Sequence, residues 1–239
     1  PRHGNHYPAP RPREQLERGD WEIRCPECHR VMIPLSNDES RVNPHNQCGV
    51  SHYCQELYAL TLGKRYGIPT VVLRYSTTQG ARQSFYNAYS GILRSFAIRL
   101  LNNLPPVIYE DGQQLRDYVY VGDVVRANLL VMEKDEADYQ VFNVGGGRAV
   151  TVLEYAELVT ELTGRSIAPQ IAGEFRYGDS RHCVSNIYKL AELGWWPTTP
   201  LRECIAEYIE WVASYRKVSD YYAPAHDVMK RAGVIMSVA

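Results

Sequence analysis

The chain has 239 residues, of which 45% are hydrophobic and 22% are charged, and its 26 basic and 27 acidic residues give a formal net charge of −1. These proportions are typical of a globular protein and exclude a disordered or collagen-like chain. A nearly neutral chain also lacks the basic excess that attracts nucleic acids or anionic lipids, so we expect neither partner.

No apolar run reaches the roughly 18 residues that cross a bilayer, and the first residues lack the apolar core of a signal peptide. We therefore expect a cytoplasmic protein without a membrane span. Six cysteines are too few for a disulfide scaffold in a chain of this length, so we expect reduced thiols.

The first 20 residues are rich in proline and glycine, show no apolar periodicity and predict a loop or an extended arm. Apolar residues at helical spacing then predict a helix over 48–66, which Gly67 and Pro69 end. The β-branched segment at 70–76 follows it and predicts a buried parallel strand.

The alternation of helices and strands continues along the chain. The sequence predicts helices at 91–103, 122–133, 151–162 and 201–213 and strands at 107–110, 117–121 and 141–144. Thr151 and Glu154 form a capping box at the start of the third of these helices. The residues after Ser214 follow no single pattern. The alternation predicts an α/β protein whose mainly parallel sheet is covered on both faces, with ligands at the carboxyl ends of the strands.

Six segments in order resemble the second half of the extended short-chain dehydrogenases/reductases, and most closely their nucleotide-sugar epimerase and dehydratase group. They are NPHNQCGVSHYCQE, GIPTVVLRYS, GARQ, EDGQQLRDYVYVGDVVRA, FNVGGGRAVTVLE and RYGDSRH, and the resemblance runs from about Asn43 to Val212. The earlier segment IRCPECHRVMIPL resembles an insert of a bacterial subgroup that includes deoxysugar 4-epimerases.

The resemblance implies an incomplete Rossmann-type doubly wound parallel sheet with a smaller C-terminal substrate-binding region. We expect this chain to be the carboxyl-terminal portion of a longer protein. Its own first residues are expected to form a loop-rich arm with a Cys-x-x-Cys insert. The expected division is an arm at 1–42, the remainder of the dinucleotide-binding domain at 43–80 and 116–147, and a nucleotide-sugar-binding region at 81–115 and 148–239. The family also implies a homodimer.

The implied activity is an NAD-dependent epimerisation or dehydration of a nucleotide sugar through a transient keto sugar. The family uses Tyr-x-x-x-Lys on a helix, where the tyrosinate is the base and the lysine holds the nicotinamide ribose. Here those positions are Cys48 and His52. A thiol is much shorter than a phenol, and a histidine is mostly neutral at pH 7. We therefore expect this pair to give severely impaired activity.

The remaining site residues follow from the same resemblance. It implies cofactor contacts at Tyr75 and Ser76, and contacts to the substrate at Thr77, Asn87, Val107, Tyr109, Arg116 and Arg176. Arg116 and Arg176 match the two arginines that bind the pyrophosphate, a role suited to a planar guanidinium.

The glycine-rich fingerprint for NAD is absent from this sequence. The triplet Gly145–Gly147 predicts a turn, since Val150 occupies the third glycine position. We therefore do not expect the chain on its own to bind NAD. Asp117 and Asp123 are expected to fix backbone segments.

Alternative interpretations come from the cysteines and from the altered catalytic pair. The chain could be a catalytically silent nucleotide-sugar-binding protein. Cys25, Cys28, Cys48 and His52 have the ligand types and spacings of a Cys3His zinc site. Simple loop thiols or a weak metal pair are the preferred interpretations of Cys25 and Cys28, and we assign no metal ligand. A third hypothesis makes Cys48 a nucleophile with His52 as its base, one helical turn away.

Overall fold

The computed structural model describes residues 3–84, 86, 91–215 and 217–239, so the predicted substrate contact Asn87 lies outside the described residues. The helices in this part of the chain are α1 (Arg13–Glu17), α2 (Gln47–Tyr66), α3 (Ile92–Leu101), α4 (Val121–Met132), α5 (Val152–Leu162), α6 (Tyr188–Glu192), α7 (Leu201–Ala213) and α8 (Tyr222–Arg231), with a 3-10 turn η1 (Asp135–Ala137). The strands are β1 (Val72–Tyr75), β2 (Thr77–Gln79), β3 (Val107–Ile108), β4 (Leu115–Tyr120), β5 (Val141–Val144), β6 (Ala149–Thr151), β7 (Gln170–Ile171), β8 (Glu174–Arg176) and β9 (Ile235–Ser237).

The predicted α/β class is confirmed. The long predicted helices correspond to α2, α3, α4, α5 and α7, and the predicted strand at 141–144 is β5. The sequence did not predict β2, the short strands β6 to β9, or the helices α1, α6 and α8. Two of these elements, α8 and β9, lie in the tail after Ser214, to which no structure had been assigned.

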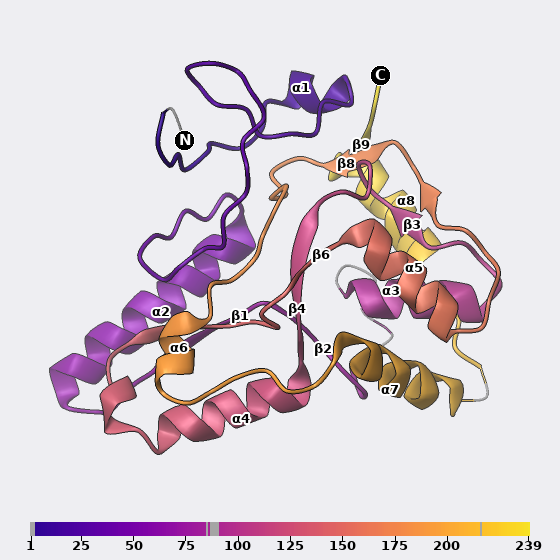
Figure 1. Cartoon of the computed structure of the whole chain (residues 1–239). Coiled ribbons are helices and arrows are strands. Elements are labelled where there is room, and N and C mark those ends of the chain that lie inside the picture. The colour runs from indigo at the N-terminus through magenta and orange to yellow at the C-terminus, as the bar shows by residue number, and fades with distance from the viewer. Residues whose placement is uncertain (1–2, 85, 87–90, 216) are drawn as a thin grey trace.

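Parallel strand pairs form the centre of the fold (Figure 1). Strand β1 pairs in parallel with β5, with Val72 opposite Val141, and β2 pairs in parallel with β4, with Thr77 opposite Tyr118. Strand β6 joins the other edge of β4 antiparallel. Two smaller sheets lie outside these pairs. Strand β3 pairs in parallel with β7, and β8 pairs antiparallel with β9. Among the described strands, β5 is the only partner of β1.

Two hydrophobic cores lie on opposite sides of β4, because successive strand residues point to opposite faces. Tyr118 enters a core formed with α3, α5 and α7. The next residue, Val119, enters a second core with α4, β5 and α6. In the first core the rings of Tyr118 and Tyr155 stack with centroids 4.1 Å apart. Strand β4 therefore connects the two halves of the molecule.

Helix α2 has well-defined ends and a largely exposed surface. The Asn46 side chain accepts a hydrogen bond from the Gly49 amide at 2.8 Å, and Gly67 ends the helix with a φ of 65°. Its only buried residue is Gly63, while the apolar side chains of Val50 and Leu57, expected on one face, are about half exposed. None of the described helices is both long and apolar enough to cross a membrane.

The predicted capping box of α5 is confirmed, and it gives a direct test of the local energetics. The Thr151 hydroxyl accepts from the Glu154 amide at 3.1 Å, and the Glu154 carboxylate accepts from the Thr151 amide at 2.9 Å. We expect T151A to lower the free energy of unfolding by about 1 kcal/mol, because one amide at the helix start loses its acceptor. Urea unfolding measures this, and T151S is the matched control that keeps the acceptor. An unchanged midpoint in T151A would contradict the assignment.

Candidate functional site

A cavity of about 390 Å³ lies between the start of α2, the first part of β4 and the loop after β8. Asn43–Asn46 and Gly49 form one wall, Arg116 projects from β4, and Gly178–Ser180 and Cys183 form the opposite wall. The amino end of a helix carries partial positive charge and unpaired amides. Together with a guanidinium, it makes the cavity suited to an anion.

Arg116 is held in place by backbone carbonyls. One terminal nitrogen donates to the carbonyls of Leu115 and Arg181 at 2.8 and 2.9 Å, and the other donates to that of Ser180 at 2.9 Å. A guanidinium has five N–H groups. Because these bonds use three of them, the remaining two can meet a ligand without a change of rotamer.

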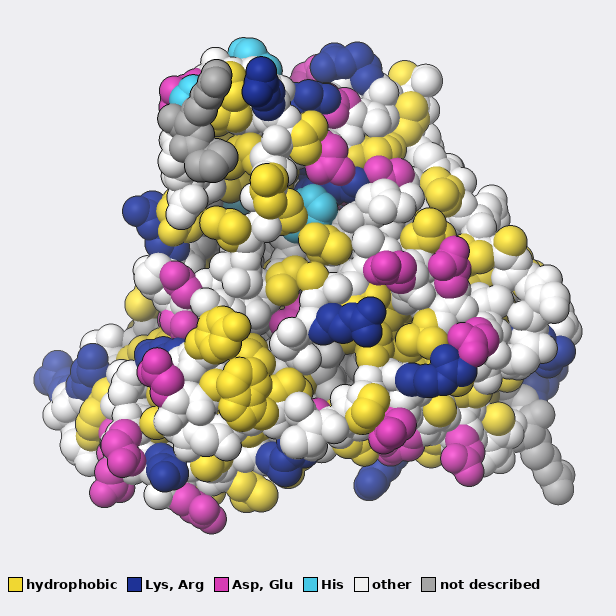
Figure 2. All heavy atoms as spheres, in the orientation of Figure 1, with side chains coloured by type: hydrophobic (Ala, Val, Ile, Leu, Met, Phe, Trp, Pro, Cys, Tyr) yellow, Lys and Arg dark blue, Asp and Glu magenta, His cyan; other side chains and the backbone are white. Residues whose placement is uncertain are grey.

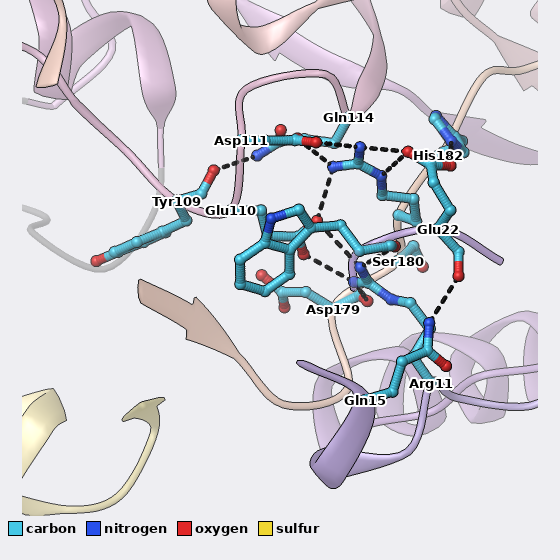
Figure 3. Close-up of polar contacts among 12 residues, drawn as sticks. Arg11, Gln15, Glu22, Tyr109, Glu110, Asp111, Gln114, Asp179, Ser180 and His182 are labelled. Atoms are coloured by element: carbon cyan, nitrogen blue, oxygen red, sulfur yellow. Dashed lines mark hydrogen bonds and ion pairs between the residues drawn. The ribbon is translucent and has the colours of Figure 1, made fainter. Parts of the chain in front are cut away.

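The loop that supplies two of these carbonyls is fixed by Arg181, whose side chain is fully buried. Figure 3 shows three of its carboxylate partners, Glu22, Glu110 and Asp111, close together. Its guanidinium donates to Glu110 at 2.9 Å and to both carboxylate oxygens of Asp111 at 2.7 and 2.9 Å. Its Nε donates to Glu22 of the arm at 3.1 Å. Burial lowers the pKa of Arg181, but the carboxylates of Asp111 and Glu22 outweigh burial and raise it overall.

A second buried arginine joins the arm to the same cluster. Arg11 donates to both oxygens of Glu110 at 2.7 and 3.0 Å and to the carbonyls of Trp21 and Asp179. Glu110 is thus shared by two guanidinium groups from opposite ends of the sequence. The arm, predicted to be a loop, is therefore docked over the cavity wall by charge-assisted hydrogen bonds.

The second predicted phosphate-binding arginine, Arg176, lies on β8 beside Tyr109. Its guanidinium carbon is 5.2 Å from the centre of the Tyr109 ring, a cation–π distance. The Tyr109 hydroxyl is hydrogen-bonded to that of Tyr222 at 3.1 Å. The structure thus brings Arg176 and Tyr109 together, as the family resemblance implies, while Val107 lies two residues earlier in β3.

Asp179 lines the cavity and follows Arg176 by three residues in the sequence. Burial raises the pKa of its carboxyl group, and the charges of Arg176 and Arg116 oppose that rise. This aspartate belongs to the RYGDSRH segment, but its place in the cavity wall was not predicted.

The predicted backbone role of Asp117 is confirmed by its contacts. Its buried carboxylate accepts from the Gly146 amide at 2.7 Å, from the Ser76 hydroxyl at 2.9 Å and from the Ser185 amide at 3.3 Å. Burial raises the pKa of Asp117, against the effect of these donors. The group joins the segments that follow β1 and β5 to the loop before α6.

Asp123 also fixes backbone, but not as a cap of α4. Its carboxylate accepts from the Thr199 amide at 3.2 Å, and its carbonyl accepts from the Trp195 indole at 3.0 Å. The N-cap of α4 is Tyr120, without a side-chain hydrogen bond. Asp123 lies in the first turn of α4, as predicted. The backbone segment that it holds is not that of α4 but one about 75 residues further along the chain.

The Gly145–Gly147 triplet is a packed turn, in agreement with the sequence-based expectation. A Cβ atom on Gly146 would lie 1.9 Å from the Tyr118 carbonyl, and one on Gly145 would lie 2.1 Å from the Asp117 carboxylate. These glycines are needed so that the segment after β5 can lie against β4.

Cys48 and His52 lie one turn apart near the start of α2, and both are exposed. Among the hydrogen bonds between described residues, none joins the two side chains, so the structure gives no support to the nucleophile–base hypothesis. Gly49, next to Cys48, lines the cavity. Cys48 and His52 themselves are not among the residues that line it.

The remaining predicted contacts lie at the ends of β1 and β2. Tyr75 is about half exposed and donates to Asn128 of α4 at 3.0 Å, while the Ser76 hydroxyl is bonded to Asp117 and to Ser185. Thr77 begins β2. The described residues thus contain neither a glycine-rich phosphate loop nor a free cation at the end of β1, and they do not by themselves fit NAD.

The four-ligand zinc hypothesis is wrong in its ligand set. Cys25 and Cys28 lie in the arm near His3, and the three ligand atoms are within 4.8 Å of one another. Cys48 and His52 are not part of this group, because they project from the exposed surface of α2. The sequence reasoning missed His3, although it lies 22 residues before Cys25 and is of the right ligand type.

Parallel strand pairs flanked by helices define a Rossmann-type α/β protein. A model of the NAD dependent epimerase/dehydratase family matches residues 26–145, about half of the chain. The chain belongs to this family.

Similar proteins include nucleotide-sugar enzymes from several organisms. The dTDP-L-rhamnose 4-epimerase of Burkholderia thailandensis is 31% identical over 210 residues, covering 87% of this chain and 56% of that protein. A putative UDP-glucose 4-epimerase of Methanocaldococcus jannaschii is 34% identical, covering 74% of this chain and 57% of that protein. The chain thus spans about half the length of the curated relatives that it matches.

Solved structures agree with the fold. The UDP-glucose 4-epimerase of Thermotoga maritima, solved with UDP-glucose, is 35% identical with a TM-score of 0.69, covering 77% of this chain and 59% of that one. The UDP-glucose 4-epimerase of Thermus thermophilus, solved with NAD, is 30% identical with a TM-score of 0.68, covering 80% and 60%. The Rossmann-type prediction is confirmed.

Because the cluster around Arg181 is buried, we expect its loss to destabilise the chain far more than the loss of an exposed ion pair. We expect R181M to lower the free energy of unfolding by about 3–5 kcal/mol, because the buried carboxylate of Glu110 and the partly exposed ones of Asp111 and Glu22 lose a charged partner. Arg202, whose exposed guanidinium pairs with Glu161, provides the matched control, and R202M should cost less than about 1 kcal/mol. Denaturant unfolding of both variants measures the difference. Equal, small losses would contradict the role given to Arg181.

Proposed function

We propose that this chain contains the nucleotide-sugar-binding part of a 4-epimerase or dehydratase that works through a transient keto sugar. The cavity that joins Arg116 to the start of α2 carries the proposal. Support also comes from the relatives, among them a UDP-glucose 4-epimerase solved with UDP-glucose. When bound, NAD supplies the hydride chemistry of this family, but the residues described here do not provide its cradle.

The pyrophosphate is the part of the ligand that this cavity suits. Arg116 has two N–H groups that its carbonyl partners do not use, and the amino end of α2 adds partial positive charge on the facing wall. A guanidinium already held by three hydrogen bonds loses little side-chain entropy on binding. Arg116 therefore acts as a preorganised phosphate contact.

We assign the second phosphate contact to Arg176, and contacts to the sugar phosphate and the base to Tyr109, Val107, Thr77 and Asn87. The proximity of Arg176 to Tyr109 supports the first part of this assignment. Asp179 lines the cavity, and the charges of Arg176 and Arg116 both act on its carboxyl group.

The substrate is proposed to be a nucleoside diphosphate sugar of the deoxysugar 4-epimerase type. The match to the Burkholderia protein spans 210 residues, against 180 for the Methanocaldococcus protein. The printed names of the relatives include both dTDP and UDP sugars. Both nucleotides therefore belong in the binding tests.

The proposed catalytic positions remain Cys48 and His52, with Tyr75 and Ser76 on the cofactor side. An exposed thiol on the first turn of α2 is shorter than a phenol, and a histidine side chain is shorter than the lysine that holds the nicotinamide ribose in this family. We infer that epimerisation by a protein with this pair is severely impaired. Nucleotide-sugar binding without turnover is the runner-up function, and the preserved Arg116 cavity favours it.

A homodimer and a cytoplasmic location complete the proposal. Helices α2 and α4 expose large apolar side chains that a partner could cover, including Leu57, Tyr58, Leu62, Leu129 and Met132. All six cysteines are free thiols, as a reducing compartment favours. Light scattering and sedimentation of the purified chain test the dimer.

Calorimetric titration with UDP-glucose and dTDP-glucose tests the binding site. We expect R116A to weaken binding of the preferred ligand by about tenfold or more, which is ~1.4 kcal/mol, because one charge-assisted phosphate contact is lost. R202A removes an exposed arginine far from the cavity and should leave affinity unchanged. Equal affinities for R116A and the unaltered chain, or a failure of the unaltered chain to bind either sugar nucleotide, would contradict the proposal.

A separate titration with NAD tests the cofactor side. We expect no saturable binding up to millimolar concentrations, because the Gly145–Gly147 turn is packed against β4 and Ser76 is already bonded to Asp117. A fluorescence or calorimetric titration decides this. Submicromolar NAD binding by the chain would overturn our view of these residues.

A further inference from the structure

The arm contains a compact hairpin that brings two cysteine sulfurs to one side. The Cys25 amide donates to the Arg30 carbonyl at 2.9 Å, and the His29 amide donates back to the Cys25 carbonyl at 2.9 Å. Arg24 and Val31 form an antiparallel bridge at the base of the hairpin. His29 adopts a left-handed φ of 56°, a conformation that costs energy in a residue other than glycine and that these hydrogen bonds maintain.

A histidine from the start of the chain completes a three-residue group with these sulfurs. The ligand atoms of His3, Cys25 and Cys28 all lie within 4.8 Å of one another. In Figure 2 histidine side chains gather at the top of the molecule, where Figure 1 shows the arm. The Cys25 side chain is buried, while the Cys28 side chain is exposed.

The spacing of these atoms agrees with tetrahedral coordination. Zinc bonds of about 2.3 Å to sulfur and 2.0–2.1 Å to nitrogen place the two ligand atoms about 3.6 Å apart in a tetrahedron. The observed distance from His3 Nδ1 to Cys25 Sγ is 3.4 Å. A set of two thiolates and one imidazole binds zinc in preference to magnesium or calcium, which favour oxygen ligands.

A carboxylate beside these residues is placed to supply a further ligand. The Glu27 carboxylate lies on the same side, with one oxygen 3.9 Å from His3 Nδ1.

We propose that His3, Cys25 and Cys28 bind a structural zinc ion that fastens the start of the arm to its hairpin. Water or the Glu27 carboxylate occupies the fourth position. The site has no part in the binding of a nucleotide sugar at Arg116. It shapes the arm, which in turn presents Arg11 and Glu22 to the buried cluster around Arg181.

Metal analysis of the full chain, purified without chelator and then given one equivalent of Zn²⁺ and desalted, tests this. We expect about one zinc per chain, reduced at least about fivefold in C25S, C28S and H3A, because each removes one of three protein ligands. C48S and C54S replace exposed thiols of α2 and should keep full zinc content. Circular dichroism establishes that each variant is folded.

Cobalt substitution gives a second readout that does not depend on any variant folding. Co²⁺ added to the metal-free chain should produce the intense visible bands of a tetrahedral site with thiolate charge transfer, and Zn²⁺ should displace them. Absence of both zinc and these bands would overturn the proposal. A Cys25–Cys28 disulfide, found by mass spectrometry in chain purified in the presence of a reductant, would also overturn it, since the pair would then belong to redox chemistry.

Discussion

The buried pairing of Arg181 and Arg11 with Glu110 is the interaction on which the candidate site depends. It joins the arm, the turn between β3 and β4, and the loop after β8. Removing these charges from water costs several kcal/mol for each ion, so the cluster is stable only when all its members are in place. Its stability is therefore tied to one arrangement of the loop, the one in which Ser180 and Arg181 present their carbonyls to Arg116.

The sheet adds a second constraint, which acts through close packing. Gly145 and Gly146 allow the end of β5 to lie against β4, and Asp117 holds their backbone and Ser76 together. Strand β4 thus positions Arg116 on the cavity side while its next residues enter the two cores. The same six-residue strand supports both the packing of the molecule and its proposed phosphate contact.

Local patterns predicted the regular elements well, because they depend on neighbouring residues. The capping box of Thr151 and the stop at Gly67 were both readable in the sequence. The short strands β8 and β9 were not, since each is stabilised by pairing with a distant segment. The candidate site followed the same rule. Arg116 came from a family motif, whereas the shared role of Arg181 depends on carboxylates that are some 70 and 160 residues away in sequence.

Chemistry and binding are separate questions for this chain. We propose that Cys48 and His52 stand where the family has its base and its cation, while Arg116 is held by the carbonyls of Leu115, Arg181 and Ser180. The proposed change at the first pair affects the turnover of a nucleotide sugar, whereas the proposed site at Arg116 affects its binding.

Hydrogen–deuterium exchange of the full chain, with and without a saturating nucleoside diphosphate sugar, shows whether the ligand binds in the Arg116 cavity. We expect slower exchange in the segments 43–49 and 178–183, which contribute residues to the two sides of this cavity. We expect no change in residues 197–201, which line a second cavity of about 310 Å³ beside Arg148. Protection confined to 197–201, or no protection in either region under saturating ligand, would contradict binding in the Arg116 cavity.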